Sequence, residues 1–134
     1  MACYKFDCSC KAVSYTVDAV EPQLAVNCWC GDCRGHSGQQ NALAVFNPQE
    51  FHFVKGEDNL LKFESSKGTF KCHCKSCGAY VNKILSNGAY VAPIYALKNE
   101  GGAPQLHPKC HIFAAHKGPM TIPDDGLPRH DEFP

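Results

Sequence analysis

The sequence lacks any long apolar segment, and it lacks an excess of charge of either sign. No apolar run approaches the roughly 20 residues that a membrane-spanning helix needs, and the residues after Met1 contain no apolar core of the kind found in secretion signals. Thirteen Lys and Arg balance thirteen Asp and Glu, so no overall field attracts nucleic acid or an anionic membrane. These absences predict a cytosolic or nuclear protein that binds neither.

Helical periodicity is scarce as well, and short alternating segments typical of β-strands take its place. Residues 13–17, 80–84 and 89–95 alternate apolar and polar side chains, and the continuous apolar run at 41–46 ends at Asn47 and Pro48. The 134 residues therefore predict a single, mainly β domain of several short antiparallel, coiled sheets. Residues 117–134 carry four of the nine prolines and predict an extended tail.

Cysteine is abundant, with ten residues, and eight of these lie one or two residues apart in three groups: Cys8 and Cys10; Cys28, Cys30 and Cys33; and Cys72, Cys74 and Cys77. A single intervening residue disfavours an intrachain disulfide, whereas thiolate metal sites favour such close pairs. A secreted disulfide scaffold would also carry a signal peptide. The spacing therefore predicts reduced thiolates that bind zinc.

Two of the groups can combine into one closed site. Cys8 and Cys10 lie near the N-terminus, and Cys74 and Cys77 belong to a two-residue-gap knuckle that ends in Gly78. Two ligands from each group would complete a four-thiolate structural zinc site and contribute folding energy directly. Cys72, two residues before Cys74, is a further possible ligand for this site or for the next one.

Cys28, Cys30 and Cys33 form a second set with only three thiols. One alternative is another closed structural site, completed by Cys72 or by a histidine (His36, His73 or His111). The other alternative leaves the fourth position to water or substrate, as in reactive zinc sites. An open position would make the ion a Lewis acid that lowers the pKa of a bound group and favours a thiolate nucleophile.

Polar residues follow the second set directly. Arg34 can pair a substrate carboxylate through two hydrogen bonds, or it can neutralise thiolate charge at the surface. The polar run of His36, Ser37, Gln39, Gln40 and Asn41 either lines a substrate pocket or forms a solvated loop. Cys3 and Cys110 are expected to be spare buried thiols, because free cysteine commonly packs as a small hydrophobe.

The order and spacing of these groups resemble the glutathione-dependent formaldehyde-activating enzyme family, which includes centromere protein V-like proteins. The resemblance covers nearly the whole chain, although Cys3, Cys72 and Cys110 have no place in the family pattern. The matching positions are Cys8 to Cys10, Cys28 to Arg34, Ser37 and Gly38, Phe53, Gly56, Cys74 to Gly78, Pro108, and His111 to Phe113.

The resemblance implies a β-rich zinc fold with two zinc ions per chain. Cys8, Cys10, Cys74 and Cys77 would hold the structural ion, and Cys28, Cys30 and Cys33 would hold the reactive one. The implied activity is that of a carbon–sulfur lyase or synthase, in which the glutathione thiolate adds to formaldehyde and gives S-hydroxymethylglutathione. Arg34, His36, Gln39 and Gln40 are the candidate glutathione contacts. The alternative from another class is a non-catalytic zinc module that binds a protein partner through its β surface.

Overall fold

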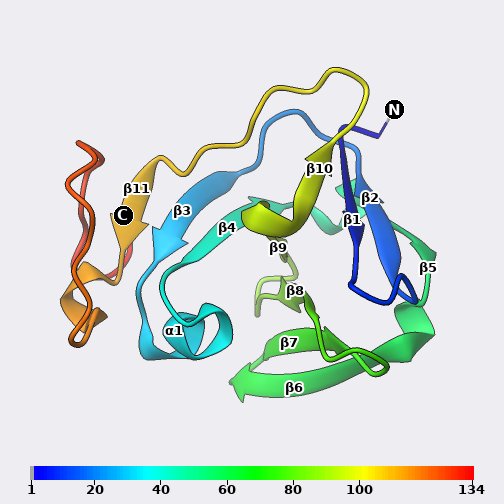
Figure 1. Cartoon of the computed structure of the whole chain (residues 1–134), viewed down its shortest axis with the longest axis horizontal. Coiled ribbons are helices and arrows are strands. Elements are labelled where there is room, and N and C mark those ends of the chain that lie inside the picture. Colours follow the sequence, from blue (N-terminus) through cyan, green and yellow to red (C-terminus); the bar gives the residue numbers. More distant parts are fainter. Residues whose placement is uncertain (1) are drawn as a thin grey trace.

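The computed structural model describes residues 2–134, except for the side chains of His36 and Ser37. The chain is mainly β, as the sequence predicts, with two sheets (Figure 1). The four-stranded sheet has the order β10–β1–β2–β5, with bounds Leu97–Asn99, Tyr4–Asp7, Ser14–Val17 and Phe51–Lys55.

The second sheet has seven strands in the order β11–β3–β4–β9–β8–β7–β6, with bounds Cys110–Ile112, Leu24–Cys28, Asn41–Phe46, Tyr90–Pro93, Tyr80–Ile84, Thr69–Cys74 and Leu60–Ser66. Its pairs are antiparallel except for β11 with β3, which are parallel. The remaining elements are the helix α1 (Gly31–Ser37) and four 3-10 turns: Pro48–Glu50, Glu57–Asn59, Ile94–Ala96 and Ala114–His116.

Three local features differ from the sequence-based expectation. Strands β1 and β10 pair with each other although most of the chain lies between them in sequence. Each is too short to show a clear alternating pattern. The segment after Cys30 forms the helix α1 rather than a simple turn. Strand β9 ends at Pro93, where a 3-10 turn begins, because proline has no N–H with which to continue the ladder.

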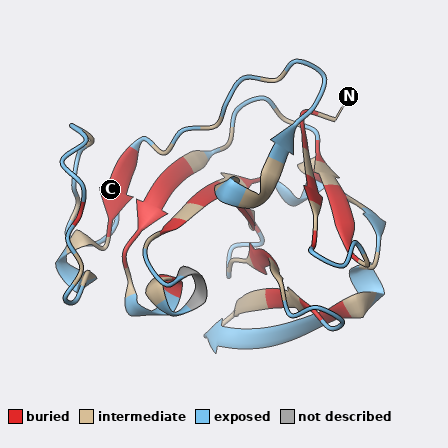
Figure 2. Ribbon diagram, in the orientation of Figure 1, coloured by how far each residue is buried: buried red, intermediate tan, exposed pale blue. Residues whose placement is uncertain are grey.

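The larger apolar core lies where the two sheets meet, and its buried strands are red in Figure 2. Phe6 and Tyr15 stack with ring centroids 4.8 Å apart, and Phe51 packs on Tyr15 at 4.7 Å. A second, smaller core is formed mainly by strands β3, β4, β9 and β11 and includes Val26 and Ile112. The second core surrounds the middle cysteine group.

Residues 117–134 run along the outer side of β11 (Figure 1). The backbone N–H of His111 donates to the Pro128 carbonyl, and His130 N–H donates to the His111 carbonyl, both at 2.9 Å. Ile122 is buried in this segment. Hydrogen bonds therefore fix this segment to the edge of the seven-stranded sheet. Among residues 2–134, no helix combines the length and apolar character needed to cross a membrane.

Candidate metal centres and the adjoining cavity

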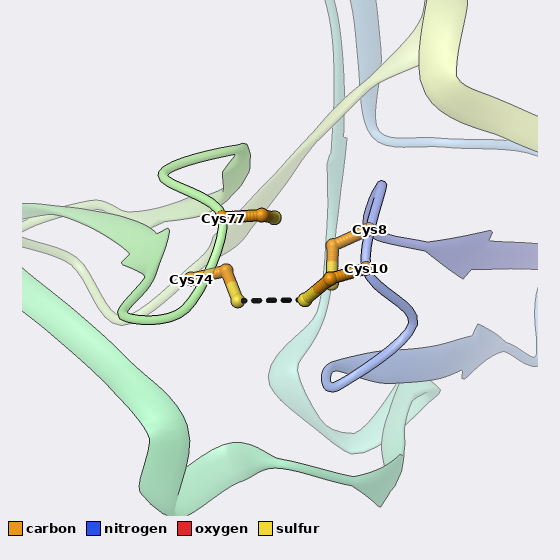
Figure 3. A group of neighbouring side chains, drawn as sticks. All are labelled: Cys8, Cys10, Cys74 and Cys77. Carbon is orange, nitrogen blue, oxygen red and sulfur yellow. Dashed lines mark hydrogen bonds between the residues drawn. The ribbon is translucent and has the colours of Figure 1, made fainter.

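The first thiol group joins the four-stranded sheet to the seven-stranded sheet. The turn after β1 supplies Cys8 and Cys10, the end of β7 supplies Cys74, and the turn after β7 supplies Cys77 (Figure 3). Their four sulfur atoms lie within 4.8 Å of one another, and four thiols at this separation could hold one metal ion. Gly78, with φ of 77°, lets the chain turn back after the last of them.

Backbone N–H groups point at two of these thiols, Cys8 and Cys77. The N–H of Val13 donates to Cys8 Sγ at 3.3 Å. The backbone N–H groups of Ala79 and Cys10 lower the pKa of Cys77 to about 6. A thiol that loses its proton near neutral pH is ready to bind a metal, because the thiolate is the ligand form.

The second thiol group lies where β3 meets α1. Cys28 is the last residue of β3, Cys30 is the N-cap of α1, and Cys33 lies in its first turn. The three sulfur atoms lie within 4.8 Å of one another. The Cys30 sulfur accepts a hydrogen bond from the backbone N–H of Cys33 at 3.4 Å. This one hydrogen bond caps α1 and also holds Cys30 close to Cys33.

Hydrogen bonds within this group favour the thiolate form of Cys30. The Cys28 thiol donates to Cys30 Sγ at 3.5 Å. Hydrogen bonds from Cys28 and then Cys33 lower the pKa of Cys30 below its ordinary value, and the nearby Lys83 acts in the same direction. A soft set of three sulfurs, one of them already favoured as thiolate, fits zinc and leaves one tetrahedral position beyond the set.

Among the side chains that the structure describes, no further Cys, His, Asp or Glu joins the Cys28 group. Cys72 belongs to neither thiol group and is fully buried in the larger core. His73 lies against the Gly78 carbonyl, and His111 is engaged by Trp29 and Asp125. The side chain of His36 lies outside the described residues.

His111 links the Cys28 group to the tail. Trp29 Nε1 donates to His111 Nδ1 at 2.9 Å, so the proton of the neutral ring is on Nε2, which lies 2.9 Å from Asp125 Oδ2. Trp29 and His111 are at most 1% exposed. The backbone N–H of Leu127 and the His111 ring lower the pKa of Asp125. This chain of hydrogen bonds connects the tail to the loop that carries the three thiols of the Cys28 group.

Replacing Asp125 with alanine is expected to loosen the tail. The variant removes the acceptor for His111 Nε2 and for Leu127 N–H, and amide protons in residues 117–134 should exchange about tenfold faster by mass spectrometry. Because the folded-state pKa of Asp125 is lowered, wild-type protection should be complete at neutral pH and should weaken as pH falls through that pKa. The neighbouring Asp124→Ala is the control. Equal exchange in both variants would contradict this role of Asp125.

Asp32 connects α1 to the strands opposite. Its carboxylate forms ion pairs with Lys71 of β7 and with Lys83 of β8, the latter at 3.6 Å. Lys83 is only 8% exposed, and a lysine this deeply buried needs a charged partner. The pairs hold the thiol loop against β7 and β8, and they place a cation beside the three sulfurs.

A cavity of about 410 Å³ adjoins the Cys28 group and is lined by all three of its cysteines. Its walls are mainly apolar side chains of the seven-stranded sheet: Leu24 and Val26 of β3, Leu43 and Val45 of β4, Val91 of β9 and Ile112 of β11. Its volume is within the range usual for small-molecule sites. The three thiols therefore face a chamber rather than packed core.

Three of the four expected glutathione contacts do not line this chamber. Arg34, Gln39 and Gln40 are absent from its lining. Arg34 instead donates from Nε to the Trp29 carbonyl at 3.1 Å, while Gln39 is exposed and Gln40 is half-buried. The side chain of the fourth predicted contact, His36, lies outside the described residues. The structure gives the other three no role that faces the cavity.

Asn41 ends the polar run that the sequence predicts either to line a substrate pocket or to form a solvated loop. It lies opposite Cys28 in the β3–β4 ladder and is fully buried, and neither its Nδ2 nor its Oδ1 has a hydrogen-bond partner. Alternate residues of a strand share a face, so Asn41 lies on the same face of β4 as the cavity residues Leu43 and Val45. A buried amide without partners is costly, but Asn41, like Arg34, Gln39 and Gln40, is absent from the lining of the cavity.

The comparisons with known proteins agree with this architecture. The family model described as glutathione-dependent formaldehyde-activating enzyme matches residues 3–116. A crystal structure of a Rhodobacter sphaeroides protein is similar, with a TM-score of 0.58 and 24% identity, over 73% of this chain and 91% of that chain. That likeness concerns the fold alone. No curated protein sequence matches the chain significantly.

Proposed function

Because the chain belongs to the glutathione-dependent formaldehyde-activating enzyme family, we propose that it is a zinc-dependent carbon–sulfur lyase or synthase. It acts on glutathione or a related thiol adduct of the S-hydroxymethylglutathione type. The observation that carries the proposal is the group of three cysteines that lines a cavity of about 410 Å³. A set of three thiols at a cavity, with no fourth ligand among the described side chains, is the arrangement expected of a reactive rather than a structural site.

Two zinc ions per chain are part of the proposal. Cys8, Cys10, Cys74 and Cys77 hold the structural ion, and Cys28, Cys30 and Cys33 hold the other. When bound at the second site, zinc lowers the pKa of a thiol ligand and polarises a neighbouring oxygen. In the addition itself, the thiol sulfur forms the C–S bond, the carbonyl π electrons pass to oxygen, and that oxygen gains the proton that the thiol has lost. Cleavage is the reverse, and no oxidant is needed.

The chain's own residues provide the surroundings for this step. The apolar walls exclude water and strengthen electrostatic interactions in the chamber. The ion pairs of Asp32 with Lys71 and Lys83 hold the loop in place.

Calorimetric titration of the zinc-loaded protein with glutathione tests the proposal. Glutathione should bind with a dissociation constant of about 1 mM or below, and S-methylglutathione should bind about tenfold more weakly, since it cannot form a thiolate. Removing the metal with a chelator should abolish glutathione binding. If the protein carries two zinc ions and still gives no heat with glutathione, the proposal is wrong, and a non-catalytic zinc module becomes the better interpretation.

A further inference from the structure

We propose that the cavity beside the Cys28 group takes sulfur compounds that carry an apolar alkyl or aryl group within two bonds of the sulfur. The inference rests on the proposed function, because it places the sulfur at the three-cysteine site. It extends the proposed function by specifying the chemical character of the group attached to the sulfur. A larger apolar aldehyde added to glutathione, or a thiol that is itself apolar, supplies that chemistry, whereas formaldehyde does not.

The lining of the chamber carries the first part of the argument. Eight of its side chains besides Phe133 are leucine, valine, isoleucine or phenylalanine, and they come from four strands and two adjoining loops. Formaldehyde adds a single carbon to sulfur and would leave most of a cavity of about 410 Å³ unfilled. Each apolar group removed from water contributes to binding in proportion to its area, so a longer substituent gains affinity here.

Charge in the lining carries the second part. Lys83 is the one cation and Asp32 the one carboxylate among the lining residues, and these two side chains pair with each other at 3.6 Å. Glutathione has two carboxylates and an ammonium group, and burying them without partners would cost far more than the contacts return. The peptide part of glutathione therefore lies outside the chamber, and the group on its sulfur points inward.

The tail, residues 117–134, contributes Phe133 to the rim of the cavity. Phe133 lines the cavity and meets Phe113 edge-on, with ring centroids 4.9 Å apart. Phe133 is 73% exposed, which places it at the rim, and it lies beyond residues 3–116 that match the family model. Backbone bonds fix the tail there, including Phe113 N–H to the Glu132 carbonyl at 2.9 Å. The aromatic rim of the chamber is thus built partly from the segment outside the family match.

The step on such a substrate needs no further reagent. The glutathione sulfur bonds to the carbonyl carbon of an alkyl or aryl aldehyde, the π pair moves to the carbonyl oxygen, and the thiol's proton ends on that oxygen. The product is a hemithioacetal with the apolar group one bond from the new C–S carbon. Cleavage returns aldehyde and thiol by the same atoms.

Calorimetry on the zinc-loaded protein tests the inference with two pairs of ligands. S-Hexylglutathione should bind about tenfold more tightly than S-methylglutathione, and phenylmethanethiol about tenfold more tightly than 2-mercaptoethanol. A preference in the first pair identifies adducts of glutathione as the source of the apolar group. A preference in the second pair alone identifies apolar thiols.

The Phe133→Ala variant locates the preference in the chamber. It should weaken phenylmethanethiol or S-hexylglutathione about threefold and leave 2-mercaptoethanol unchanged. Phe63→Ala, an exposed phenylalanine of β6 outside the cavity lining, is the matched control and should change neither.

The outcomes separate this inference from the proposed function. Binding of glutathione and 2-mercaptoethanol with no preference in either pair overturns the inference and leaves the proposed function standing. Absence of binding by every thiol overturns both. A preference that Phe133→Ala and Phe63→Ala reduce equally shows that the apolar group binds elsewhere, and this outcome also overturns the inference.

Discussion

Replacing Cys74 with serine is expected to unfold the protein or to lower its free energy of unfolding by about 5 kcal/mol or more. Zinc binding by four thiolates is worth on the order of 10 kcal/mol in small zinc domains, and Cys74 joins β7 to the turn after β1 through Cys8 and Cys10. Chemical denaturation followed by circular dichroism, together with the metal content of the purified variant, measures the effect.

Cys72→Ser is the matched control for this prediction. Cys72 lies in the same strand, two residues earlier, and is equally buried, but it belongs to neither thiol group. It should keep both metal ions and lose only the roughly 1 kcal/mol typical of a core substitution. A Cys72→Ser variant that loses metal and unfolds as readily as Cys74→Ser would show that the ligand set has been misassigned.

Replacing Cys30 with serine should give the opposite result, a folded protein that no longer binds thiols. The serine hydroxyl can still accept the Cys33 N–H and cap α1, so the loop keeps its shape. The variant should retain one metal ion per chain, lose glutathione binding at least about tenfold, and denature within about 1 kcal/mol of the wild type.

Cys110→Ser controls for the loss of a thiol near the site, since Cys110 is buried in the same smaller core and binds no metal in the proposed sets. It should bind glutathione like the wild type. If Cys30→Ser unfolds as readily as Cys74→Ser, the middle thiol group is structural, and the proposed enzymatic function loses its main support.

Sequence patterns reached the fold class and most of the strands because these depend on local alternation. The apolar run at 41–46 coincides with β4, and the alternating residues 80–84 coincide with β8. Strands β1 and β10 were missed because, at four and three residues, each is too short to show a clear alternation of apolar and polar side chains. The helix α1 was missed because a seven-residue helix has no apolar period to detect and depends instead on the Cys30 cap.

Residue spacing indicated the close cysteine pairs and the Cys28 group, since one or two intervening residues bring cysteines together whatever the surrounding fold, whereas Cys10 and Cys74, 64 residues apart, meet only in the folded structure. The chamber could not be read in this way. Its walls come from strands that are adjacent only in the folded sheet, and its rim includes Phe133 from the other end of the chain. Asn41 belongs to the predicted polar run, but its full burial and its lack of hydrogen-bond partners follow only from the folded structure.

The sequence by itself determined that this protein is a small, mainly β domain whose thiols are spaced to bind metal, because both properties follow from local periodicity and spacing. Tertiary structure alone decided what the middle thiol group faces. Pairing of β3 with β4 and β11 brings apolar side chains around Cys28, and Asp32 neutralises Lys83 beside them. The choice of ligand therefore depends on contacts between distant segments, which no local pattern encodes.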